Sequence, residues 1–326
     1  MSGQYKQHYN AFKQNPAEFW LAQSKCIPWY KTPQNAYTQD SDDLYHWFDD
    51  GQLNTSYLAL DQHVEAGFGE QTALIYDSPV TNTKQTYNYS QLQQEVAKFA
   101  GVMQSLGVQK GDRVVIYMPM IPQAVIGMLA CARLGAVHSV VFGGFAAHEL
   151  AVRIDDAKPK LVLSASCGVE VSNIIEYKPL LDDAIKRATH KVDHCVIYQR
   201  EQATATLNSD QDIDWAKAMQ TAQAVDPVPV SGSDPLYILY TSGTTGLPKG
   251  VVRENGGHAV ALNYSMKNVY GMEPGEVFWA ASDIGWVVGH SYIVYAPLMY
   301  RCATVLYEGK PVRTPDASAF WRVVEE

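Results

Sequence analysis

Short apolar runs alternate with segments of helical period along most of the chain. Apolar side chains recur every three or four residues between 90 and 106, which predicts an amphipathic helix with Ser90 as its N-cap. The other predicted helices begin at Pro122 or cover 147–157, 179–188 and 257–269, with an apolar helix near Met299 and a last one capped by Asp316. The predicted strands are 72–76, 85–89, 113–118, 138–142, 161–164, 194–198, 236–240, 277–280 and 304–307. Such alternation predicts an α/β fold of doubly wound, mostly parallel sheets.

The pattern divides the chain into two parts. Residues 1–65 are rich in aromatic side chains and lack a clear period, which indicates an irregular segment that wraps over a neighbouring core. Residues 66–326 form the α/β domain, and the polar stretch 200–233 is a connection with one short helix around Trp215.

Composition and charge narrow the class of protein. The chain has 326 residues, of which 47% are hydrophobic and 18% charged, as in ordinary globular proteins. The formal net charge of −9 argues against a general nucleic-acid binder, which carries basic faces. The five cysteines form no closely spaced pair, so we expect neither a zinc site nor a disulfide framework. This use of cysteine indicates a reducing compartment.

The N-terminal sequence indicates where the protein works. It begins with polar residues and shows no apolar core of a signal peptide. The longest apolar stretch after Pro122, residues 124–132, is much shorter than the roughly 20 residues of a membrane helix. We therefore expect a cytoplasmic protein without a membrane partner.

The stretch 240–250, Tyr-Thr-Ser-Gly-Thr-Thr-Gly-Leu-Pro-Lys-Gly, carries the strongest chemical signal. It follows a predicted buried strand, and its glycines allow backbone N–H groups to form an anion-binding nest. Hydroxyl groups and one ammonium group surround these glycines, so a nucleotide triphosphate tail is the expected ligand. The predicted phosphate-binding residues are Thr241, Ser242, Gly243, Thr244, Thr245, Gly246 and Lys249, with Lys249 and Thr244 as the catalytic ones.

Two other interpretations of this loop are possible from its composition. A flexible turn rich in Ser, Thr and Gly is the usual fate of such composition, but a plain turn does not explain the ammonium and hydroxyl groups placed together after a strand. The P-loop of NTPases requires Ser or Thr directly after the lysine, where this chain has Gly250, and Pro248 would disturb the opening of a helix.

These residues resemble the adenylate-forming enzymes, the superfamily of acyl-CoA synthetases, peptide-synthetase adenylation domains and luciferases. The stretch Asp-Ile-Gly-Trp-Val-Val-Gly-His-Ser-Tyr at 283–292 is similar to the short-chain acyl-CoA synthetases, the acetate and propionate ligases. This likeness is supported by Trp47-Phe48, Leu53-Asn54 and residues 60–63. The propionate branch is the one that residues 251–257 and 177–182 resemble. The resemblance covers the chain from about residue 5.

The resemblance implies two half-reactions and the small molecules that they use. A carboxylate attacks the α-phosphorus of MgATP to give an acyl-adenylate, and the thiol of coenzyme A then displaces AMP. Trp286, Val287 and Val288 map onto the wall of the acyl pocket, and Gly143, Gly144 and Val288 onto contacts with coenzyme A. The segment 170–173 departs from the family, which commonly has arginine there, because this chain has Glu170. An inward Glu170 would repel nucleotide phosphates.

The resemblance also places several catalytic parts beyond residue 326. No Tyr-Gly-x-Thr-Glu stretch occurs, and the family's adenine pocket, magnesium-binding carboxylate and C-terminal lysine would follow later, so no metal ligand is expected within this chain. We therefore expect the N-terminal portion of a propionate-activating ligase, with little activity alone. An acetate-activating ligase and a non-catalytic remnant are the alternatives.

Overall fold

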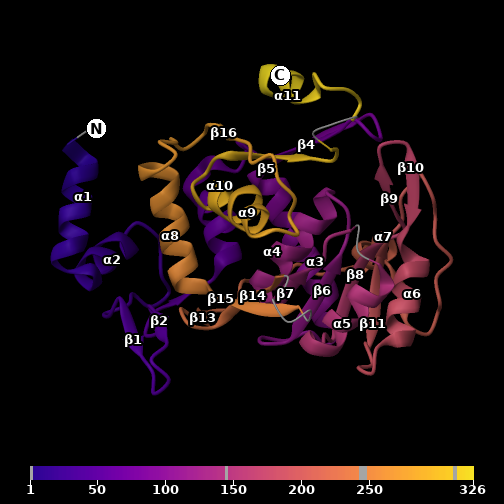
Figure 1. Cartoon of the computed structure of the whole chain (residues 1–326), viewed down its shortest axis with the longest axis horizontal. Coiled ribbons are helices and arrows are strands. Elements are labelled where there is room, and N and C mark those ends of the chain that lie inside the picture. Colours follow the sequence, from indigo (N-terminus) through magenta and orange to yellow (C-terminus); the bar gives the residue numbers. More distant parts are fainter. Residues whose placement is uncertain (1–2, 144–145, 242–247, 311–313) are drawn as a thin grey trace.

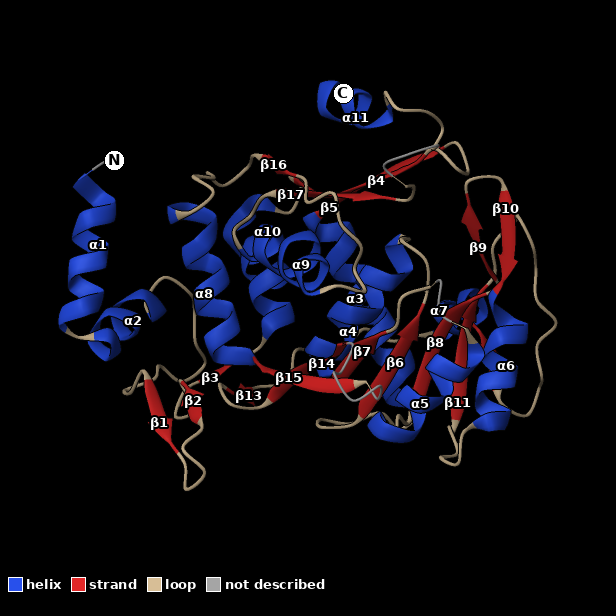
Figure 2. Ribbon diagram, viewed as in Figure 1, coloured by secondary structure: helices blue, strands red, loops and turns tan. Residues whose placement is uncertain are grey.

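The computed structural model describes residues 3–143, 146–241, 248–310 and 314–326. Two β-sheets with helices between and around them form its body (Figure 1 and Figure 2). Within the described ranges the larger sheet has seven strands and the smaller one four. The predicted α/β class with mostly parallel sheets is confirmed.

Neighbouring strands of the larger sheet run parallel throughout its described part, except for the last pair. The strand order is β12-β11-β8-β6-β7-β14-β15, and β15 is antiparallel to β14. The bounds are β6 Arg113–Tyr117, β7 Val137–Val140, β8 Leu161–Ala165, β11 His194–Tyr198, β12 Asp212–Asp214, β14 Pro235–Thr241 and β15 Lys249–Glu254.

Helices cover both faces of this sheet. Val114 and Ile116 of β6 belong to one apolar cluster, whereas the intervening Val115 and the following Tyr117 belong to another. Because successive strand residues point to opposite faces, each cluster fills one side of the sheet. The first side packs against α3 (Tyr89–Ser105), α4 (Pro122–Leu134) and α7 (Trp215–Thr221), the second against α5 (Ala147–Ala157) and α6 (Tyr177–Arg187). The sheet is therefore doubly wound, as predicted.

The smaller sheet shares a core with the larger one. Its order is β16-β17-β4-β5, with β5 antiparallel to β4. Leu74 of β4 and Leu306 of β17 belong to the same apolar cluster as Val114, so one core fills the space between the sheets. The bounds are β4 Thr72–Ser78, β5 Thr83–Asn88, β16 Val277–Phe278 and β17 Ala303–Tyr307. Helical segments of this region are α8 Asn255–Asn268, α9 Val287–Gly289 and α10 Ala296–Met299, with π-helical η1 Tyr57–Asp61, η2 Val64–Phe68 and η3 His290–Tyr295.

The N-terminal segment is more regular than its sequence predicts. It begins with α1 (Gly3–Gln14) and α2 (Pro16–Ser24), so the prediction of an irregular start is wrong. Aromatic side chains hold α2 on α8, since the ring centroids of Phe19 and Trp20 lie 5.8 and 5.4 Å from that of Tyr264. Two short pairs follow: β1 (Tyr37–Gln39) with β2 (Tyr45–Trp47), and β3 (Gln52–Leu53) with β13 (Val230–Ser231).

Local hydrogen bonds correct two helix caps. The side chain of Asn88, not Ser90, caps α3 by accepting the N–H of Gln91 at 2.7 Å. Asp316 accepts hydrogen bonds from the N–H and hydroxyl of Ser318, and Ser318 is the N-cap of the last helix. Asn88 has the extended backbone of an N-cap, whereas Ser318 has helical backbone angles and its side chain makes no capping hydrogen bond.

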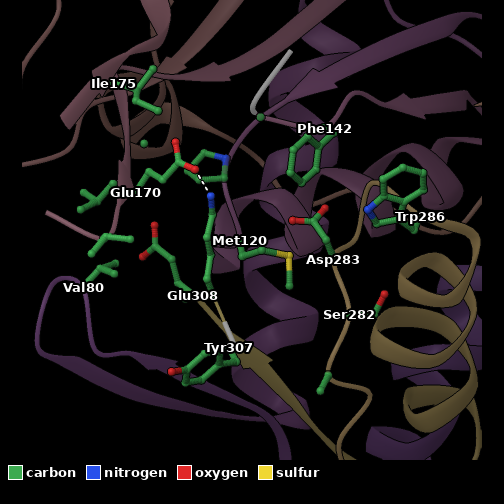
Figure 3. Close-up of a pocket in the computed structure, with 18 of the residues that line it drawn as sticks. Val80, Met120, Phe142, Glu170, Ile175, Ser282, Asp283, Trp286, Tyr307 and Glu308 are labelled. Carbon is green, nitrogen blue, oxygen red and sulfur yellow. Dashed lines mark ion pairs between the residues drawn. The ribbon is translucent and has the colours of Figure 1, made fainter. Parts of the chain in front are cut away.

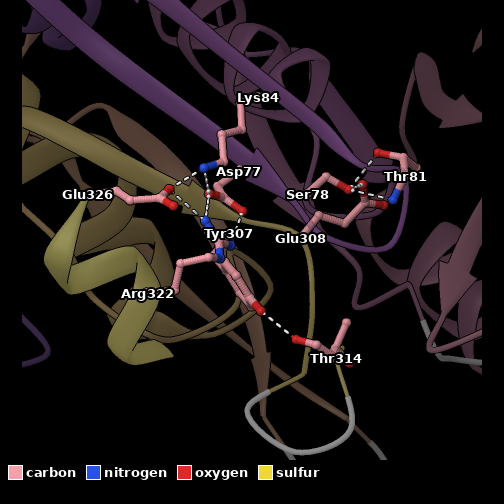
Figure 4. Close-up of polar contacts among 9 residues, drawn as sticks. All are labelled: Asp77, Ser78, Thr81, Lys84, Tyr307, Glu308, Thr314, Arg322 and Glu326. Atoms are coloured by element: carbon pink, nitrogen blue, oxygen red, sulfur yellow. Dashed lines mark hydrogen bonds and ion pairs between the residues drawn. The ribbon is translucent and has the colours of Figure 1, made fainter. Parts of the chain in front are cut away.

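The last helix, α11 (Ala319–Glu325), is attached to the smaller sheet by charged side chains (Figure 4). Arg322 donates two hydrogen bonds of 2.8 and 2.9 Å to Asp77 of β4, and Lys84 of β5 pairs with Glu326. The bidentate geometry suits guanidinium and carboxylate groups. Among the described residues, no helix is both long and apolar enough to cross a membrane.

Candidate active site

The predicted phosphate loop joins the last two strands of the larger sheet. Thr241 ends β14, Lys249 begins β15, and the two are paired in register, with both exposed. The predicted residues Ser242, Gly243, Thr244, Thr245 and Gly246 lie outside the described residues. The loop therefore links two antiparallel strands, and the strand β15 that follows it was missing from the sequence-based prediction.

The loop begins at the edge of the sheet where ligands bind in open α/β folds. Because β6, β7, β8 and β14 are parallel, their carboxyl ends meet at this edge. The chain passes from β6 to β7 on one side and then returns to β8 on the other side of β6. Such a reversal of strand order creates a crevice at the carboxyl ends.

A cavity of about 380 Å³ opens at this reversal (Figure 3). Its walls come from both sheets: Met120 follows β6, Phe142 follows β7, and Tyr307 and Glu308 lie at the end of β17. A second cavity of about 650 Å³ lies between the N-terminal segment, β15 and α8. Its strand residues, such as Arg253, lie toward the opposite end of β15 from Lys249. The smaller cavity is the candidate active site because it lies at the carboxyl edge.

Gly143 lines this cavity and allows a tyrosine to approach the backbone. A Cβ atom on Gly143 would lie 2.1 Å from the Tyr177 hydroxyl oxygen, and one on Gly168 would lie 2.7 Å from it. Tyr177 in turn stacks on Tyr117 at 4.8 Å between centroids. Burial raises the pKa of the Tyr177 hydroxyl, so it stays protonated. Gly144, the other predicted contact with coenzyme A in this turn, lies outside the described residues.

The three residues predicted for the acyl pocket are consecutive and partly exposed. Trp286 lines the cavity, with its ring centroid 6.2 Å from that of Phe142. Val287 and Val288 begin α9, and their side chains are about half exposed. In the described part of the chain Trp286 is the member of this trio that reaches the cavity wall.

Asp283 places a partly buried carboxylate in the same wall. Its Oδ1 accepts the N–H of Gly285 at 2.7 Å. Burial raises the pKa of this carboxyl group, and the hydrogen bond from Gly285 opposes the shift. Sequence reasoning included Asp283 in the 283–292 motif without giving it a role; its position two residues before Gly285 in that motif was the available signal.

Glu308 is a buried carboxylate that sequence reasoning missed. It forms a bidentate ion pair with Arg200 at 2.8 and 3.0 Å, and it accepts hydrogen bonds from Tyr76 at 2.5 Å and Ser78 at 2.8 Å. Burial and the neighbouring carboxylate raise the pKa of Tyr76, which therefore remains a donor. The position of Glu308 directly after a predicted strand was a usable signal, but nothing in the sequence pointed to Arg200.

Glu170, where the chain departs from its family, lies in a hairpin also missed by sequence reasoning. The strands β9 (Cys167–Glu170) and β10 (Asn173–Glu176) form this hairpin, and Val171 follows Glu170 with φ of 58°. The Glu170 carboxylate pairs with Lys310, which follows β17 (Figure 3). The acidic residue at which this chain differs from its family thus has a cationic partner.

No metal centre is found in the part of the chain that the structure describes, where no group of three or more His, Cys, Asp or Glu side chains could hold a metal ion. Asp283, Glu308 and Glu170 line one cavity, but Glu308 is committed to Arg200 and Glu170 to Lys310. These residues therefore do not fit a magnesium site.

Comparison with known families agrees with this architecture. Residues 61–326 match the model of the family described as AMP-binding enzyme, and residues 5–59 match that of the acetyl-coenzyme A synthetase N-terminus. The first match covers more than half of the chain, so the chain belongs to the AMP-binding enzyme family.

Curated relatives narrow the likeness to short-chain acyl-CoA synthetases. The rat protein named acyl-CoA synthetase short-chain family member 3, mitochondrial, is 54% identical over 329 residues, covering 99% of this chain and 48% of that protein. The propionate–CoA ligase of Escherichia coli strain K12 is 46% identical over 329 residues, covering 99% of this chain and 51% of the ligase. The chain thus spans about half the length of the curated relatives it matches.

A solved structure shares the fold. The acetoacetyl-CoA synthetase from Streptomyces lividans matches with a TM-score of 0.89 and 24% sequence identity, over 100% of this chain and 49% of that chain. This likeness establishes the arrangement of helices and strands.

Proposed function

We propose that the protein is an AMP-forming acyl-CoA synthetase that activates a short-chain carboxylate, with propionate preferred, and transfers the acyl group to coenzyme A. The observation that carries the proposal is the position of Thr241 and Lys249, the described ends of the predicted phosphate loop, at the carboxyl edge that also forms the cavity wall beside Trp286. The name of the Escherichia coli relative supports propionate as the substrate.

In the first proposed step, a carboxylate oxygen bonds to the α-phosphorus of ATP and the bond to pyrophosphate breaks. Lys249 and the loop N–H and hydroxyl groups hold the β- and γ-phosphates and neutralise the charge that develops on the leaving group. Thr244 is the hydroxyl residue proposed to act with Lys249. Magnesium would add further neutralisation, from ligands not found among the described residues.

In the second proposed step, the thiol sulfur of coenzyme A attacks the acyl carbonyl and AMP departs. Gly143 and Gly144 are proposed to let the thiol substrate pass close to the backbone. Trp286, Val287 and Val288 are proposed to bound the acyl chain, which favours two or three carbons over longer chains. One methylene group discriminates by about 1–3 kcal/mol, so acetate should react more slowly than propionate without being excluded.

The test is the release of pyrophosphate with acetate, propionate and butyrate, each with ATP and coenzyme A. It should be run on chain 1–326 and on a protein in which this chain is extended to the length of its curated relatives. We expect the highest kcat/KM with propionate in the extended protein and little turnover by chain 1–326 alone. Equal or better use of acetate would assign an acetate–CoA ligase, and no turnover of any carboxylate by the extended protein would favour a non-catalytic role.

The cytoplasmic location belongs to the proposal as well. The word mitochondrial in the name of the rat relative argues against it. Fractionation of cells that express the tagged protein would decide between the two compartments.

A further inference from the structure

An ion pair joins opposite walls of the candidate active site. Glu170 ends β9 beside the larger sheet, and Lys310 follows β17 of the smaller sheet. Both residues line the cavity, and their charged groups meet across it (Figure 3). Opening the cavity between these two elements would require the pair to separate.

The exposure of this pair makes it easy to break. The side chains of Glu170 and Lys310 are 44% and 54% exposed, whereas those of Arg200 and Glu308 are each 5% exposed. An exposed ion pair contributes at most about 1 kcal/mol, but separating a buried pair leaves an uncompensated charge. Of the two pairs, the one between Glu170 and Lys310 can therefore exchange partners at little cost.

The charges around Lys310 determine which ligand it can take. Among the described residues that line the cavity, Lys310 is the one basic side chain, and the acidic ones are Glu170, Asp283 and Glu308. Glu308 is neutralised by Arg200. An anion that enters is therefore attracted by Lys310 and repelled by Glu170 and Asp283, and a phosphate group carries more charge than the carboxylate it would displace.

We propose that Lys310 binds a phosphate group of coenzyme A, and that Glu170 holds Lys310 across the cavity until this substrate arrives. The inference rests on the proposed function, because that function supplies the phosphorylated thiol. Lys310 thus provides, from the end of β17, a cation at a site where the segment 170–173 offers Glu170 instead of an arginine. Glu170 lowers the affinity for the substrate because it competes for the same ammonium group.

The test is calorimetric titration of coenzyme A, and of pantetheine as the same thiol arm without phosphates, into chain 1–326 and its variants. We expect Lys310→Gln to weaken binding of coenzyme A about tenfold, as for the loss of one charge-assisted hydrogen bond, and to leave pantetheine binding unchanged. Glu170→Gln should strengthen binding of coenzyme A several-fold, and Lys310→Arg should retain most of the affinity.

Lys110→Gln is the matched control. Lys110 is also a half-exposed lysine in an ion pair, with Asp234 at 2.7 Å, but it precedes β6 and so lies at the amino edge of the larger sheet. Its loss should leave the affinity for coenzyme A unchanged. The inference is overturned if the unmodified chain does not bind coenzyme A, if Lys310→Gln has no effect, or if it weakens coenzyme A and pantetheine equally.

A second measurement separates this inference from the proposed function. Exchange of pyrophosphate into ATP, dependent on a carboxylate, requires no coenzyme A and is measured in the extended protein. If pyrophosphate exchange occurs and Lys310→Gln does not change the affinity for coenzyme A, the inference is overturned and the proposed function stands. If no carboxylate supports pyrophosphate exchange but Lys310→Gln weakens binding of coenzyme A, the proposed function is overturned and the contact between Lys310 and a phosphate group stands.

Discussion

Gly143 and Gly168 leave the space in the cavity wall that the hydroxyl group of Tyr177 fills. From the sequence, Gly143 was expected to allow close approach of coenzyme A, and this remains a prediction. The structure adds a packing reason for glycine, because any side chain at this position meets Tyr177 before it meets a ligand. A single missing Cβ atom thereby determines the shape of the wall.

Replacement of Gly143 by alanine tests this packing. We expect Gly143→Ala to lower the free energy of unfolding by about 1–3 kcal/mol, because the new methyl group must displace a buried hydroxyl. In a Tyr177→Phe background the nearest atom becomes a ring carbon at 3.0 Å, so the penalty should shrink. Urea denaturation measures both values. Gly3→Ala, at a position with open space, is the control, and an unchanged midpoint for Gly143→Ala would contradict the packing argument.

Sequence reasoning could assign residues to one site only where they lie near one another in the chain. Trp286 was expected in the wall of the acyl pocket because it stands in a local motif, and the structure places it beside the cavity. Arg200 was not anticipated, because its partner Glu308 lies 108 residues further along the chain. Only the docking of the two sheets brings these charges together.

At the scale of elements, α3 shows how local hydrogen bonds determine where a helix begins. Asn88 accepts the N–H of Gln91, and the Gln91 side chain accepts the N–H of Asn88 at 2.9 Å. This reciprocal arrangement satisfies two N–H groups that have no partner within the helix. The apolar period predicted the helix correctly, but several polar residues near its start could have served as the cap.

Removal of the cap should destabilise the protein measurably. We expect Asn88→Ala to lower the free energy of unfolding by about 1 kcal/mol, because the N–H of Gln91 loses its acceptor. Ser90→Ala is the matched control at the cap that the sequence predicted, and its effect should be within about 0.5 kcal/mol. Urea midpoints of the two variants decide the matter, and a larger loss for the Ser90 variant would reverse the assignment.

The strand β15 could not be recognised from its own residues. Its backbone pairs with β14, and the side chains of Val251 and Val252 are exposed although they are apolar. The segment shows no alternation of buried and exposed positions, so the usual signal of a half-buried strand is absent. Its partner, which lies before the loop, decides its conformation.

At the scale of the whole molecule, packing brings together three of the buried histidines, which come from different elements. His138 of β7, His258 of α8 and His290 of η3 lie in the core, and the rings of His138 and His290 are 5.4 Å apart between centroids. His138 is within 2.6 Å of the Tyr295 hydroxyl. Burial lowers the pKa of His258 to about 3 and that of His290 to about 4, and it lowers the pKa of His138 well below its usual value.

These histidines should make the protein sensitive to acid. Their folded-state pKa values are below the unfolded value near 6.5, so the unfolded chain binds more protons between about pH 4 and 6.5 and stability falls as the pH decreases. We expect a loss of about 1 kcal/mol for each histidine between pH 7.5 and 5.5, measured by urea denaturation. His290→Gln should reduce this pH dependence. A stability that is equal or higher at pH 5.5 would contradict the prediction.

The sequence by itself determined the local features: the period of each helix, the apolar runs of the buried strands and the glycine-rich loop after Tyr240. These features depend on neighbouring residues, because period and turn chemistry act over a few positions. The tertiary structure alone decided the order of the strands, the partner of Glu308 and the burial of the three histidines. Such contacts join residues far apart in the chain, and they form only when the two sheets close over one core.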